Sequence, residues 1–107
     1  MAAFGVRIAC YVNGVTIVNL CFNCHQSGSS NDNCQMRCVR RRAGHADKIL
    51  VGVAEFTLPE DNEARSWTWV DEYIPESGEW DYVLQVKKVD GSGDFRQMLM
   101  TATHNKR

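Results

Sequence analysis

Three features are absent from the sequence. Neither positive nor negative residues are in clear excess, no apolar segment is long, and no basic segment at the N-terminus precedes an apolar one. Twelve lysines and arginines offset 13 aspartates and glutamates, so the formal net charge is -1. A near-neutral chain lacks the basic footprint of a nucleic-acid-binding protein, and we expect no nucleic-acid partner. No apolar run approaches the roughly 20 residues that cross a bilayer, and no basic segment precedes an apolar one at the N-terminus. We therefore expect neither a membrane span nor an export signal.

An apolar repeat of helical period is also missing. Instead, apolar and polar residues alternate with a period of two, and the residues concerned are mostly β-branched or aromatic. Short segments of this kind are separated by turn-forming residues along all 107 positions. The sequence predicts one domain over residues 1–107, an all-β, antiparallel β-sandwich that is jelly-roll-like and has about seven or eight short strands.

The first two predicted strands are FGVRIAC and VTIVNLCF, separated by a segment that contains Asn13 and Gly14. The Asn-Gly pair accepts the positive φ angles of a tight type I′ turn. The sequence therefore predicts that these two strands pair as an antiparallel hairpin.

The segment KILVGVAEF, residues 48–56, is a nearly continuous apolar run. Runs of this kind are typical of central strands that are buried on both faces. We expect this strand to lie in the middle of the core, with Gly52 marking a bulge or a close approach of another segment.

Aromatic residues concentrate in the second half of the chain, at alternating positions. This spacing predicts that one face of a strand carries Trp67, Trp69, Asp71 and Tyr73, and that the core face of the next carries Trp80, Tyr82, Leu84 and Val86. Packing in a core or between subunits is favoured over an exposed platform that stacks sugars, because aromatic side chains dominate cores and interfaces. The interface candidates are Trp67, Trp69, Tyr73 and Trp80.

Five cysteines are many for a reducing cytoplasm, and four of them lie in the Cys-rich segment 21–38. This segment contains CFNCH, the pattern that attaches haem to c-type cytochromes, but a loop-forming run follows His25 where a cytochrome has a helix. Without that helix or an export signal, haem is not expected. Cys10, outside the segment, is expected to be a small core residue.

Two kinds of crosslink remain open for Cys21, Cys24, Cys34 and Cys38. Four thiolates, or three with His25, would offer zinc a tetrahedral structural site. Alternatively, the second strand and QMRCVRR run antiparallel and bring the thiols close enough for one or two disulfides. Buried, unlinked thiols are the third possibility, and no cofactor is required by the sequence.

Arg40, Arg41 and Arg42 form the basic run of the sequence. They cannot all lie on one face of a strand, so a solvated edge or a protein contact is favoured over phosphate binding. All three arginines are therefore interface candidates, together with the aromatic residues named above. His45 and His104 fall in a loop and near the C-terminus, and we expect them to be solvated.

Catalytic constellations are not evident in the sequence. Asp90 and Asp94 flank a Gly-Ser-Gly turn, and two carboxylates are too few for a calcium site. No Ser/His/Asp set, paired carboxylates or phosphate loop occurs, so we expect no enzyme activity.

The segment from Ser66 to Thr103 resembles a small β-sandwich module of bacteriophage virion proteins. The module has a strand ending near Trp-x-Asp, a Pro-x-x-Gly turn, a Tyr-x-Leu-x-Val strand, a Gly-Ser-Gly hairpin and a closing strand rich in Leu, Thr and Ala. The matching residues are Trp69, Asp71, Pro75, Gly78, Tyr82, Leu84, Val86, Gly91, Ser92, Gly93, Leu99, Thr101 and Ala102. These are turn and core positions, which specify fold better than function.

The resemblance implies a structural virion protein made in the host cytoplasm. Members of the family look like trimeric heads of tail fibres or like capsid cement and decoration proteins. A tail-fibre head follows a long shaft in its chain, whereas this sequence opens with a strand, so we expect a decoration subunit. The implied partners are the major capsid protein and two further copies in a homotrimer. The alternatives are a receptor- or carbohydrate-binding tail-fibre module and a small zinc-stabilised adaptor.

Overall fold

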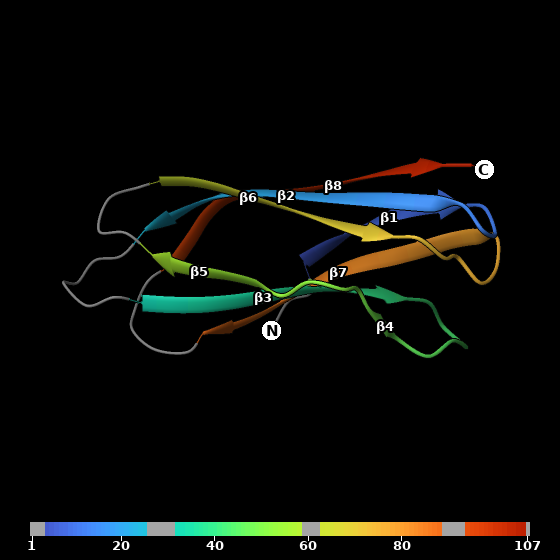
Figure 1. Ribbon diagram of the computed structural model, residues 1–107, viewed down its shortest axis with the longest axis horizontal. Helices are drawn as coiled ribbons and strands as arrows, with labels where there is room; N and C mark the ends of the chain where they lie inside the picture. The colour runs from blue at the N-terminus through green and yellow to red at the C-terminus, as the bar shows by residue number, and fades with distance from the viewer. Residues whose placement is uncertain (1–3, 26–31, 59–62, 89–93, 107) are drawn as a thin grey trace.

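A computed structural model shows the chain as two antiparallel β-sheets stacked face to face (Figure 1). It describes residues 4–25, 32–58, 63–88 and 94–106. The strands in chain order are β1 (Phe4–Cys10), β2 (Val15–His25), β3 (Asp32–Arg41), β4 (Lys48–Ile49), β5 (Ala54–Leu58), β6 (Glu63–Asp71), β7 (Gly78–Lys88) and β8 (Asp94–Asn105). The described residues contain no helix.

Sheet A has the order β1-β7-β3-β4, with β5 also pairing with β3, and sheet B has the order β6-β2-β8. All the strand pairs are antiparallel. Strands β6, β2 and β8 lie along the upper side of Figure 1, and β3, β4 and β5 of sheet A lie along the lower side. The predicted all-β antiparallel sandwich is thus confirmed, with eight strands among the described residues.

The core lies between the sheets and follows from the alternation in each strand. β2 turns Val18, Leu20 and Phe22 inward, and β7 turns Trp80, Tyr82 and Leu84 inward. The predicted core face of β7 is confirmed, with Val86 packed at its margin. Each fully buried aliphatic or aromatic side chain contributes about 1.5–3 kcal/mol relative to exposure.

The predicted hairpin between the first two strands is wrong. β1 pairs with β7 in sheet A, whereas β2 lies between β6 and β8 in sheet B. The connecting turn therefore carries the chain from one layer to the other, with φ of 62° at Asn13, whose N–H donates to the carbonyl of Ile74. Gly14 is needed there because a Cβ atom would collide with the ring of His104.

The apolar run 48–56 is not a central strand either. It forms the short β4, then bends at Gly52, where φ is 109°, and enters β5, all at the edge of sheet A beside β3. The bend brings the Gly52 carbonyl to the indole N–H of Trp69, at 2.7 Å, so the expected close approach is confirmed. That hydrogen bond draws the segment towards β6 and interrupts the edge strand.

Candidate functional site

The cysteines do not gather into one site. β2 and β3 belong to different sheets, so the antiparallel pairing expected to bring their thiols together does not exist. Cys21 is exposed on the outward face of sheet B, whereas Cys34 and Cys38 are buried on the inward face of sheet A. No disulfide joins Cys10, Cys21, Cys34 and Cys38 to one another.

A four-cysteine zinc site is incompatible with these positions. Cys21 faces away from the interior that holds Cys34 and Cys38, and the described residues contain no group of three metal-ligating side chains. The side chains of Cys24 and His25 lie outside the described residues, and so do the residues around Asp90. The expectation that Cys10 is a core residue is confirmed, since it is 3% exposed.

Burial makes Cys38 an unreactive thiol. Desolvation, aided by the nearby charge of Asp71, raises the pKa of Cys38 to about 12. The nucleophilic thiolate is therefore scarce at neutral pH. Cys38 acts as a small apolar residue of the core.

A buried polar cluster, which we name the Asp71 cluster, lies between the sheets. The carboxylate of Asp71, at the end of β6, is 0% exposed and accepts hydrogen bonds from three side chains of the opposite layer. Arg40 Nη1 lies 2.8 Å from Oδ2, Lys48 Nζ lies 3.0 Å from Oδ1, and the Tyr82 hydroxyl lies 2.9 Å from Oδ2. Alternation in the sequence predicts that Asp71 shares a face with tryptophans, but it does not reveal the three partners, which lie on other strands.

Two cations against one carboxylate make the Asp71 cluster a tight electrostatic link between the sheets. Arg40 is 5% exposed, and its Nη1 also donates to the carbonyl of Tyr73. Its guanidinium stacks on the Trp80 ring at 4.9 Å. A buried charge is tolerated only when it is paired and hydrogen-bonded in this way, so each member depends on the others.

Tyr82 extends this cluster towards β2. Burial raises the pKa of the Tyr82 hydroxyl well above its ordinary value, and the negative charge of Asp71 acts in the same direction. The hydroxyl therefore stays protonated and serves as a hydrogen-bond donor.

His104, expected to be solvated, is half-buried, and both of its ring nitrogens lie within hydrogen-bond distance of a partner. Its Nδ1 lies 2.8 Å from the hydroxyl of buried Thr16, and its Nε2 accepts the backbone N–H of Tyr11 at 2.8 Å. Because Nε2 is an acceptor, the neutral ring carries its proton on Nδ1 and donates it to Thr16. The histidine thus ties the C-terminal strand to the turn after β1.

His45 is also only partly solvated, with 30% of its side chain exposed, because it belongs to a second cluster around Trp80. His45 Nε2 lies 2.9 Å from Glu76 Oε2, and the imidazole meets the Trp80 ring edge-on at 4.9 Å. Arg42 packs on the same indole at 5.1 Å and donates to the Ser77 carbonyl at 3.2 Å. These contacts fix the loop before β7 against the end of β3.

The three consecutive arginines therefore go to three environments, as their alternation predicted. Arg40 is buried in the Asp71 cluster, Arg41 pairs with Asp47 at 2.9 Å, and Arg42 lies on Trp80. Arg40 is too deeply buried to contact a partner. Arg41 and Arg42 are partly exposed and remain interface candidates.

The aromatic candidates divide between core and surface. Trp69 and Trp80 are each 1% exposed, so neither can stack a sugar. Trp67 is half-buried, and Tyr73 is 56% exposed. The prediction that Tyr73 shares one strand face with Trp67, Trp69 and Asp71 is wrong, because β6 ends at Asp71 and Ile74 takes the next buried place.

Apolar side chains also reach the surface along the interrupted edge of sheet A. Ile49, Val51 and Val53 are 50%, 91% and 54% exposed, and we name them the edge strip. Sequence reasoning missed this surface because an apolar run is read first as a buried strand.

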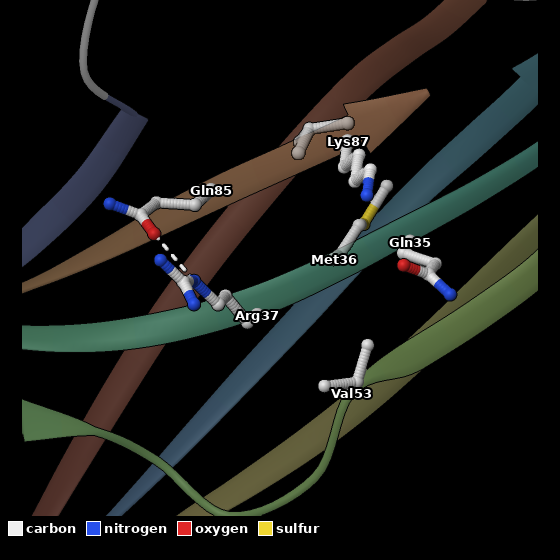
Figure 2. A pocket seen from close by; sticks show the side chains of 7 residues that line it. Gln35, Met36, Arg37, Val53, Gln85 and Lys87 are labelled. Atoms are coloured by element: carbon white, nitrogen blue, oxygen red, sulfur yellow. Dashed lines mark hydrogen bonds between the residues drawn. The ribbon is translucent and has the colours of Figure 1, made fainter. Parts of the chain in front are cut away.

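A shallow hollow of about 460 Å³ lies beside the edge strip on the outer face of sheet A. Val53 borders it, and the polar side chains of Gln35, Arg37, Gln85 and Lys87 line it (Figure 2). Arg37 Nε donates to Gln85 Oε1 at 2.6 Å, which is the hydrogen bond drawn in the figure. A polar border beside apolar side chains is the composition of a protein contact rather than of a closed ligand cavity.

Comparisons with known proteins leave the family open. No protein-family model, no curated protein and no solved structure matches the chain. Within the described residues, no helix has the length and apolar character needed to cross a membrane. The function must therefore be argued from the fold and its surfaces.

Proposed function

We propose that the chain is a non-enzymatic structural subunit of a bacteriophage virion, a capsid cement or decoration protein. In this role it is made in the host cytoplasm, forms a homotrimer and binds the major capsid protein. The sandwich fold is compatible with this class of protein. The observation that carries the proposal is the edge strip.

The edge strip supports a role in binding another protein, because its side chains are apolar and yet exposed to solvent. Val51 is 91% exposed, although the run that contains it has the composition of a buried strand. Contiguous apolar side chains at the surface of a soluble domain mark sites of protein interaction. A partner that covers Ile49, Val51 and Val53 would place them in the apolar environment for which they are suited.

The polar side chains around the strip also suit a protein contact. Arg41 and Asp47 pair with each other, and Arg37 is bonded to Gln85. Such side chains form a hydrated rim around an apolar centre, which is the usual arrangement of protein interfaces. The major capsid protein is the partner that we expect to bind this apolar centre and its polar rim.

Localisation in particles tests the proposal. An antibody raised against the chain, applied to density-gradient fractions of a phage lysate that contains it, should detect the chain with DNA-filled heads. The Val51→Asp variant should leave the head fraction, while Ala43→Asp, at an exposed loop position outside the strip, should remain in it. Recovery of the wild-type chain exclusively in the soluble fraction would contradict the proposal.

A further inference from the structure

Sheet B has an outward face that no described segment covers. It consists of every second residue of three strands, from Val15 to Asn23 in β2, from Ala64 to Val70 in β6, and from Gln97 to Asn105 in β8. These side chains are exposed or half-buried, and their inward neighbours form the core. We name this surface the sheet B face.

The sheet B face carries no charged side chain at any of its described positions, although 23% of the residues in the chain are charged. Its residues are aliphatic, hydroxyl or amide side chains and the thiol of Cys21. A hollow of about 250 Å³ surrounds Cys21 and Asn23 near one end, where Arg65 of the edge strand borders it. The depletion of charge is the compositional signal of the centre of an interface.

The strand register arranges this face in transverse rows. Val70, Ile17 and Thr103 form one row, and the next has Asn19 between Thr68 and Thr101. Within the second row the Thr68 hydroxyl donates to Asn19 Oδ1 at 2.7 Å. Polar groups that bond to each other within the face are less costly to bury than unpaired ones.

We infer that the sheet B face is the surface at which three copies of this chain meet around a three-fold axis, an inference that rests on the homotrimer of the proposed function. Near a cyclic axis each side chain lies close to its own copies, so a charged residue would meet like charges. Identical partners cannot supply the opposite charge at that position. A different protein could, so the lack of charge favours self-association over a foreign partner.

The dimensions of the face determine how strong this association can be. Eight residue steps along β2 at about 3.4 Å each give a length of about 27 Å, and three strands about 4.8 Å apart give a width of about 14 Å. The flat area is therefore about 400 Å², below the roughly 800 Å² per partner of a standard interface. The trimer is accordingly expected to dissociate on dilution.

Charge insertion tests this surface. In sedimentation equilibrium of the full chain, the wild type should approach three times 12.1 kDa at tens of micromolar. Ile17→Lys and Thr101→Lys should each weaken association about 100-fold or more, because like-charge contacts cost several kcal/mol. Ala9→Lys, at an exposed outward position of sheet A, is the matched control and should leave the mass unchanged.

Labelling of Cys21 gives a second readout that needs no substitution. The thiol is exposed in the single chain, so its reaction with a thiol reagent should slow as the protein concentration rises and the face is covered. A wild-type mass of one chain would overturn the homotrimer and this inference together. A three-chain mass that persists in both lysine variants, or a Cys21 reaction rate independent of concentration, would overturn this surface and leave the proposed function standing.

Discussion

The two outward faces of the sandwich differ in charge, although they belong to one small domain. Sheet A turns Arg7, Asp81 and Arg41 outward in one row, with Arg7 and Asp81 joined at 2.8 Å, whereas the described outward positions of sheet B are uncharged. The inward faces differ too, because Asp71 of sheet B is held there by Arg40 and Lys48 from the side of sheet A. A near-neutral net charge therefore conceals an uneven distribution of charged side chains between the two outward faces.

The largest expected effect comes from removing the charge that sheet B contributes to the interior. Asp71→Asn should lower the free energy of unfolding by about 3–5 kcal/mol, because it leaves Arg40 buried without a counter-charge. Urea denaturation at neutral pH measures the change. A loss no greater than that of Asp81→Asn would show that the Asp71 cluster does not hold the sheets together.

Alkaline pH should reveal a second, smaller effect inside the sandwich. The folded pKa of Cys38 is raised from 9.0 to about 12, so its contribution to stability is complete below pH 9 and is lost as the pH rises towards 12. At pH 10 the expected loss is about 1 kcal/mol. Urea midpoints at pH 7 and pH 10 measure it, and Cys38→Ala should show a weaker pH dependence. Identical pH dependence in the two proteins would exclude Cys38 as its source.

The smallest effect is expected on the outward face of sheet A. The hydrogen bond with Arg7 lowers the pKa of Asp81, so the stability from this pair is present above pH 3.8 and is lost as the pH falls through the folded pKa. Exposed pairs contribute little and are screened by salt. Asp81→Asn should therefore change the urea midpoint only slightly at low salt and less at high salt. A large change at high salt would show that the outward charges are structural.

Local alternation predicted much of this fold but not its connections. The period of two correctly indicated an all-β sandwich and the inward face from Trp80 to Val86, because burial of every second residue leaves a direct trace in the sequence. The sequence gives a weaker indication of which strands pair with each other. The Asn13-Gly14 pair is compatible both with a hairpin and with the observed crossing between layers, in which Gly14 lies against His104.

The candidate surfaces were less predictable for the same reason. The sequence suggested one cysteine site, but placing β2 and β3 in different sheets separates Cys21 from Cys34 and Cys38. The Asp71 cluster combines residues from four strands, and the alternation of the sequence showed only that Asp71 shares a face with tryptophans. The edge strip depends on the bend at Gly52, which exposes a run whose composition suggests burial.

The native mass of the unreduced chain reports its self-association, its thiol linkage and its metal content together. A self-associating structural subunit whose thiols lie apart should give a species near three times 12.1 kDa at tens of micromolar, with no bound metal. A stable monomer that carries one zinc ion would contradict this account. It would mean that the sheet B face does not bind other copies and that the cysteines lie close enough together to bind a metal.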